Sequence, residues 1–159
     1  MLLQALPYFQ PAYYSPGMDA ALERMLNLLL ESERAGVAVL DSLATEVRHP
    51  ELKELLLDAR EDESHNVVAL ERLVREGGGT PSAATGPFAG KVAAVGNMRG
   101  RLALLIRGQE WVARKIEETL ALAPESGPIR ECLQKMANRH RHEIEWGRAE
   151  LIRLMDTVN

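Results

Sequence analysis

The sequence of 159 residues predicts an all-α protein folded as an antiparallel four-helix bundle. All eight prolines lie outside the interiors of the helix-like stretches, where proline is poorly tolerated. Within those stretches, apolar residues recur at spacings of three and four, which is the pattern of a helix with one buried face. Two of the expected connections, 46–49 and 123–127, are so short that the helices they join must be antiparallel neighbours.

The first hairpin comprises a helix from about residue 17 to 45 and a second helix that begins at Pro50. Asp19 is a suitable N-cap for the first helix, and the run Gly77-Gly78-Gly79 is a strong stop for the second. The apolar stripe of the first helix consists of Leu22, Met25, Leu26, Leu29, Gly36, Leu40 and Leu43. That of the second consists of Leu52, Leu55, Leu56, Ala59, Leu70, Leu73 and Val74.

The second hairpin comprises a helix over about 98–122 and a helix that begins at Pro128. Residues 77–96 connect the two hairpins, and an extended chain of that length can run along a bundle because it gains about 3.3 Å per residue against about 1.5 Å in a helix. We therefore expect a crossover that makes the second and third helices parallel, with a short helix near 88–95.

The chain divides into an N-terminal arm, residues 1–16, and the bundle, residues 17–159. The arm holds four aromatic residues between prolines, Tyr8, Phe9, Tyr13 and Tyr14. These rings either pack over their own bundle or dock on a partner subunit. Together with Trp111 and Trp146, they supply more large apolar surface than a lone small bundle needs, which predicts a homodimer.

Composition argues against several classes of function. A net charge of −4 gives no general attraction to nucleic acid or to an anionic membrane surface. No apolar run approaches the roughly 20 residues that span a bilayer, so no membrane segment is expected. Cys132 is the only cysteine, which fits a reducing compartment and predicts a cytoplasmic location.

Polar residues interrupt the apolar stripes of the first hairpin near their middles. Glu33 falls in the inward-facing row of the first helix, and a carboxylate buried there needs a cation or a hydrogen-bond partner. In the second helix the row passes through Asp62 and Asn66, with Glu63 and His65 flanking it. Asp62 and His65 are three residues apart and therefore share a face.

The second hairpin carries polar residues at a comparable level. Gln109 lies in the inward row of the third helix with Glu110 beside it, and His140 lies in the row of the fourth helix with Glu143 less than one turn later. Carboxylates and imidazoles that converge inside a bundle are what a di-iron or di-manganese site requires.

In helix number and in the placement of this polar level, residues 18 to 157 resemble the ferritin-like superfamily, which includes ferritins, rubrerythrins and demethoxyubiquinone hydroxylases. The segments Glu31–Gly36 and Glu110–Glu118 also look like an uncharacterised ferritin-like family. The superfamily pattern is one Glu from each of two helices and Glu-x-x-His from each of the other two.

The match to that pattern is partial. Glu33 corresponds to the first Glu, and Asp62-Glu63-Ser64-His65 corresponds to Glu-x-x-His with Asp in place of Glu. Gln109 stands where the second Glu is expected, which leaves Glu110 to rotate inward. The fourth helix offers only the reversed pair His140-x-x-Glu143.

The resemblance implies a metal-binding oxidoreductase in which iron or manganese activates O₂ or peroxide. The expected metal ligands are Glu33, Asp62, His65, Glu110, His140 and Glu143. The alternative is a metal-free bundle that acts as an interaction or stress-related module, with Glu33, Gln109 and His140 joined in a buried hydrogen-bond network. Glu33 also has structural partners available in Arg114 and Arg139.

Overall fold

The computed structural model describes residues 17–156, with side chains to residue 153. Five helices follow one another along the chain: α1 (Ala20–Glu46), α2 (Pro50–Glu76), α3 (Phe88–Ala93), α4 (Met98–Leu122) and α5 (Pro128–Asp156). No strand occurs in these residues. The predicted arm lies outside the described part of the chain, and the homodimer stays a prediction.

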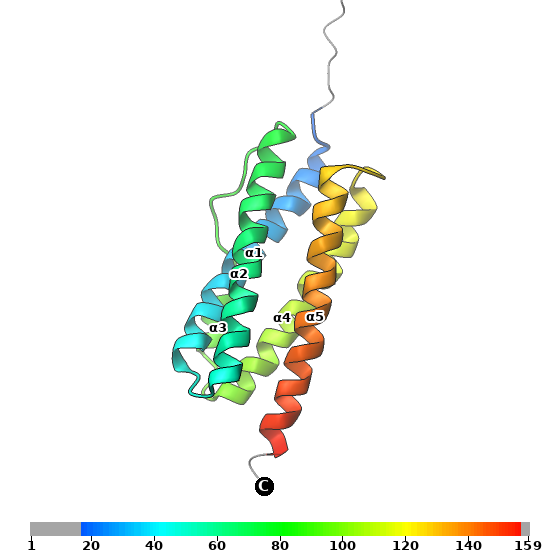
Figure 1. Ribbon diagram of the computed structural model, residues 1–159. Helices are drawn as coiled ribbons and strands as arrows, with labels where there is room; N and C mark the ends of the chain where they lie inside the picture. Colours follow the sequence, from blue (N-terminus) through cyan, green and yellow to red (C-terminus); the bar gives the residue numbers. More distant parts are fainter. Residues whose placement is uncertain (1–16, 157–159) are drawn as a thin grey trace, which may run out of the picture.

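The four long helices form a bundle of two hairpins, which confirms the predicted fold (Figure 1). α1 and α2 are antiparallel, as are α4 and α5, whereas α2 and α4 run in the same direction. The chain from the end of α2 returns along the bundle and forms α3 before α4 begins. Within residues 17–156 no helix is both long enough and apolar enough to cross a membrane.

Local signals set the ends of the helices. The Asp19 carboxylate accepts a hydrogen bond of 3.0 Å from the backbone N–H of Ala21, as expected for an N-cap. Asn97 caps α4 in the same way, with its Oδ1 atom 2.7 Å from the backbone nitrogen of Gly100. At the end of α2 the chain turns through Gly78, whose φ of 81° favours glycine.

The crossover is held against the polar side of α1. Arg34 donates hydrogen bonds to the backbone oxygens of Ser82 and Ala84, at 2.6 and 2.8 Å. Asn27 accepts from the backbone nitrogen of Ser82 at 2.7 Å, and Glu31 accepts from the Ser82 hydroxyl at 2.5 Å. These contacts fix the long connection along the bundle, so that α3 packs against both α1 and α4.

The core consists of two apolar clusters separated along the bundle axis. One lies where α1 begins and α2 ends and also includes residues of α4 and α5; among its members are Leu22, Leu26, Leu29, Leu30, Leu70, Val74, Ile116, Leu133 and Met136. The other contains residues from the opposite end, among them Val39, Leu40, Leu43, Leu52, Leu56, Val92, Leu102 and Leu105. Polar side chains fill the level between the two clusters.

Candidate functional site

Each of the four long helices contributes one buried polar side chain to this level. The exposed fractions are 1% for Glu33, 2% for Glu63, 7% for Gln109 and 1% for His140. Glu143, one turn after His140 on α5, is also largely buried, with 13% of its side chain exposed. We refer to these five residues as the polar cluster. Buried polar groups of this kind require partners, because each loses its contact with water.

A chain of hydrogen bonds links four members of the cluster. Glu33 Oε1 lies 2.8 Å from His140 Nε2, and His140 Nδ1 contacts Gln109 Oε1. Gln109 then donates from Nε2 to Glu63 Oε1 at 2.6 Å. The second oxygen of Glu33 accepts from Asn66 Nδ2 at 3.1 Å. Both ring nitrogens of His140 thus face oxygen atoms, an arrangement that suits the protonated imidazolium.

Two carboxylate oxygens in the cluster remain without a hydrogen-bond partner among the described residues. They are Oε2 of Glu63 and Oε2 of Glu143, and both are buried. Ligand atoms of Glu63, Glu143 and His140 all lie within 4.8 Å of one another. Gly36 makes room for this arrangement, since a Cβ atom there would lie 1.8 Å from Glu63 Oε2. The cluster therefore has unused acceptor capacity where three ligand groups meet.

The surroundings of Glu63 and Glu143 favour the protonated forms of these two carboxylates, because they raise both pKa values. Burial raises the pKa of Glu63 well above its usual value, and the nearby charges of Glu33 and Glu143 raise it further. Burial also raises the pKa of Glu143 to about 7, against the lowering effect of the His140 charge. In the absence of another cation, protons compensate the negative charge of the cluster.

His140 is affected by opposing influences. Burial lowers its pKa, but the charge of Glu33 and the hydrogen bond to it outweigh burial, with a further contribution from Glu143. The net result is a pKa above the ordinary value of histidine. A cation that entered the cluster would therefore have to displace protons, and its binding would strengthen as the pH rises.

The structure brings together three of the six residues that the sequence suggested as ligands: Glu33, His140 and Glu143. The burial of Glu33 and His140 in the inward rows is confirmed. Gln109 is also buried as predicted, and it lies between His140 and Glu63 rather than leaving its place to Glu110.

The expected convergence of the other three predicted ligands on the cluster is not found: Asp62, His65 and Glu110 have other surroundings. Asp62 forms an ion pair with Arg139 across the surface, and His65 is exposed. Glu110 forms an ion pair with Arg148.

Sequence reasoning placed Glu63 beside the inward row rather than in it. The signal that identifies Glu63 is the spacing of the buried residues Leu56, Ala59, Glu63 and Leu70. Leu56 is fully buried and Leu55 only partly, which turns Glu63 inward and Asp62 outward. Asn66 then occupies the position three residues after the inward Glu, where the superfamily pattern has His.

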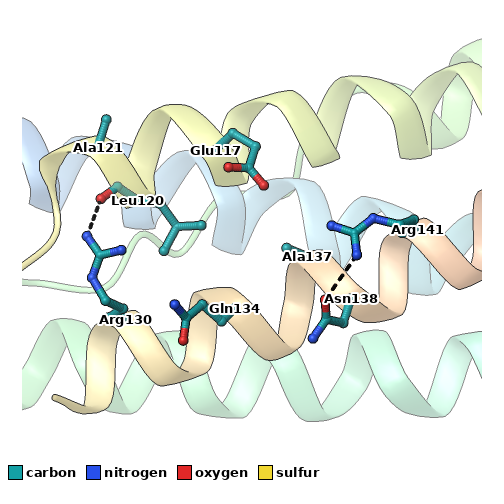
Figure 2. Close-up of a pocket in the computed structure, with 8 residues that line it drawn as sticks. All are labelled: Glu117, Leu120, Ala121, Arg130, Gln134, Ala137, Asn138 and Arg141. Carbon is teal, nitrogen blue, oxygen red and sulfur yellow. Dashed lines mark hydrogen bonds between the residues drawn. The ribbon is translucent and has the colours of Figure 1, made fainter. Parts of the chain in front are cut away.

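A separate depression of about 730 Å³ lies between α4 and α5 (Figure 2). Arg130 lines it and donates to the backbone oxygen of Leu120 at 2.8 Å, which satisfies a carbonyl at the end of α4. Arg141, also in its lining, donates to Asn138 Oδ1 at 3.2 Å. No member of the polar cluster lines this depression, and Arg130 and Arg141 form local hydrogen bonds there.

Comparison with known proteins agrees with this architecture. Residues 20–150 match the model of a family described as a domain of unknown function, DUF6306. The chain belongs to the DUF6306 family. A search of curated proteins finds no match.

Among solved structures, the DUF6306 chain is similar to a protein from Bacillus anthracis str. Ames, whose structure is described as that of ferritin like, diiron-carboxylate proteins. The TM-score is 0.62 and the sequence identity 17%, over 87% of this chain and 96% of the other. The ferritin-like fold predicted from the sequence is thereby confirmed.

The cluster of the DUF6306 chain differs from the two-metal ligand set of helical bundles. Such sites use four carboxylates and two imidazoles, whereas here the inward positions hold three carboxylates, the single imidazole of His140 and the amides of Asn66 and Gln109. Glu63, Glu143 and His140 form a group of three ligands that could hold one divalent cation. Two carboxylates and an imidazole suit iron and manganese.

Proposed function

We propose that the chain binds one divalent metal ion, iron or manganese, between Glu63, His140 and Glu143, and that this centre serves an oxidoreductase reaction. The observation that supports it is that ligand atoms of these two carboxylates and of the buried imidazole lie within 4.8 Å of one another, with one oxygen of each carboxylate lacking a hydrogen-bond partner among the described residues. Ligands held at 2.0–2.2 Å from one ion lie within about 4.4 Å of each other. The present spacing of up to 4.8 Å therefore requires only small side-chain movements.

The neighbouring residues favour this use of the three ligands. Glu33 accepts from Nε2 of His140, which orients the ring and places Nδ1 3.5 Å from Oε2 of Glu143. Nδ1 also contacts Gln109 Oε1, so an ion bound at Nδ1 would replace that contact. Gln109 holds Oε1 of Glu63 and so leaves Oε2 as the ligand atom.

When bound, iron or manganese supplies the capacity to bind and reduce O₂ or peroxide. The two apolar clusters on either side of the polar level shield it from bulk water along the bundle axis. This shielding strengthens the electrostatic interactions between the charged side chains of the cluster.

A second candidate function is a metal-free interaction module. It is supported by the hydrogen-bond chain from Glu33 through His140 and Gln109 to Glu63, in which both nitrogens of His140 already have partners. In that case the raised pKa values of Glu63 and Glu143 keep these groups neutral, and the cluster only fixes the relative position of the helices.

Metal titration separates the two candidates. Metal-free protein is mixed with Mn²⁺, with Fe²⁺ under argon, or with Mg²⁺, and thermal unfolding and bound metal per chain are measured. At 100 times Kd, binding to the folded state adds about 2.7 kcal/mol, which raises Tm by roughly 5–10 °C for a chain of this size. We expect this rise with Mn²⁺ or Fe²⁺, a stoichiometry of one, and little effect of Mg²⁺.

Matched variants locate the site. Glu63→Gln and Glu143→Gln should each abolish the metal-dependent rise, whereas Glu61→Gln, an exposed change on the same helix as Glu63, should preserve it. The metal proposal is wrong if no metal binds or if all three variants respond alike. A measured stoichiometry of two ions per chain would instead support the two-metal site that the sequence resemblance implies. Oxidoreductase activity is tested separately, by O₂ or peroxide consumption with the loaded protein and a reductant.

A further inference from the structure

A cavity of about 540 Å³ connects the polar cluster with the surface between α1, α3 and α4. Its walls are mostly apolar and include Leu28, Phe88, Leu104, Trp111 and Val112. Glu33, Glu63, Gln109 and His140 also line it. The volume falls in the range of about 300–1,000 Å³ that is typical of small-molecule sites. The cavity is therefore large enough for an organic ligand that reaches the cluster.

The crossover builds one side of this cavity. The backbone nitrogen of Gly86 donates to the oxygen of Glu31 on α1 at 3.1 Å, which fixes the chain just before α3. The ring of Phe88, at the start of α3, then packs directly on Gly108 of α4, where a Cβ atom would lie 2.5 Å from the ring. The aromatic wall is thus positioned by backbone contacts on two helices and is part of the fold.

The charges along the cavity differ between its surface and its interior. Lys91 and Arg107 line it, are both exposed, and form no ion pair with any described residue. Glu31 also lines it, but its carboxylate already accepts a hydrogen bond from Ser82. The interior contains the carboxylates of Glu33 and Glu63. An anionic ligand group would be attracted to the cationic surface side and repelled from the interior.

We propose that this cavity binds a carboxylate with an apolar chain, with its carboxylate at Lys91 and Arg107 and its chain directed toward the polar cluster. The apolar walls receive the chain, and Lys91 and Arg107 receive the charge. A role of this ligand as a substrate rests on the proposed metal centre, whereas its binding does not. Binding to metal-free protein therefore tests the cavity independently of the metal.

Tryptophan fluorescence provides the assay. Of the two tryptophans, Trp111 lines the cavity and Trp146 does not, so Trp146→Phe leaves a single reporter. Octanoate, decanoate and dodecanoate are titrated below their micelle concentrations into this metal-free protein. Because burial of each methylene is worth about 0.8 kcal/mol, affinity should rise by up to about fourfold per methylene while the chain still fits. Absence of saturable binding, or no dependence on chain length, would contradict the proposal.

The charge of the ligand and of the protein is tested with decanol and with a double variant. Lys91→Gln/Arg107→Gln should weaken decanoate binding about three- to tenfold, as expected for two exposed ion contacts, and leave decanol binding unchanged. Arg24→Gln/Lys53→Gln is the matched control, because both residues are exposed and neither lines the cavity. Equal losses in both double variants, or equal losses for decanoate and decanol, would overturn the assignment of the carboxylate.

Obstruction of the cavity is the final test. Ser32 on α1 lines the cavity and is only half-buried, so Ser32→Phe adds a ring to the ligand space. With the helix content verified by circular dichroism, this variant should lose binding of both decanoate and decanol. If it fails to fold, the surface variants still decide the outcome. Retention of metal binding together with loss of decanoate binding would show that the two sites fail separately.

Discussion

Gly36 allows a sharp test of the geometry of the polar cluster. In Gly36→Ala the new Cβ atom would lie 1.8 Å from Glu63 Oε2 and 2.7 Å from its Cδ atom, so the carboxylate must move. Overpacking of this kind costs about 1–3 kcal/mol. Replacing a helical glycine by alanine contributes about 0.5–1 kcal/mol in the opposite direction. We expect a net loss of unfolding free energy of about 1 kcal/mol and loss of metal binding.

Gly36→Ala should stabilise the protein, rather than destabilise it, when the Glu63 carboxylate is absent. In a Glu63→Ala background, Gly36→Ala should stabilise the protein by about 0.5–1 kcal/mol, because only the helix preference remains. The coupling in this double-mutant cycle, measured by urea unfolding, should reach about 1–3 kcal/mol. Gly90→Ala in α3, where a Cβ atom meets nothing within 4 Å, serves as the control. Equal effects of Gly36→Ala in both backgrounds would refute the placement of Glu63.

Three further predictions concern the metal-free protein. Because the pKa of Glu143 is raised to about 7 in the folded state, the folded protein binds more protons than the unfolded chain above pH 4.5; unfolding free energy should therefore fall by about 3 kcal/mol between pH 4.5 and 7. The raised pKa values of Glu63 and His140 act in the same direction. Glu143→Gln should flatten the dependence of unfolding free energy on pH. An unfolding free energy that rises with pH, measured by urea unfolding, would contradict this prediction. Asn97→Ala should cost about 1 kcal/mol through loss of the α4 cap, with Asn97→Asp nearly neutral. Arg34→Met should increase amide hydrogen exchange in residues 79–86 before it affects the long helices, and unchanged exchange there would argue against the role of Arg34 in holding the crossover.

The architecture was predictable because its signals are local. Proline at positions 50 and 128 and the cap at Asp19 define where helices begin, and the apolar spacing of three and four defines which stretches are helical. The crossover followed from the length of the connection. None of these inferences requires knowledge of how far a helix is rotated about its axis.

The candidate site depends on that rotation, and there the prediction was incomplete. Successive residues are about 100° apart on a helix, so an error of one position exchanges Glu63 for Asp62. Leu55 and Leu56 are both apolar and left the choice open, and only packing against the other helices resolves it. For Glu33, Gln109 and His140 the flanking apolar residues were less ambiguous, and these three side chains are buried as predicted.

The polar level lies across the seam between two hairpins that are each continuous in sequence. Glu33 and Glu63 come from the α1–α2 hairpin, whereas Gln109, His140 and Glu143 come from the α4–α5 hairpin. An ion bound to Glu63, His140 and Glu143 would cross-link the two halves at mid-height. Local contacts form faster than contacts between distant segments, so we expect each hairpin to form before the two dock. Such a cross-link would then slow the separation of the halves while leaving the rate of folding nearly unchanged.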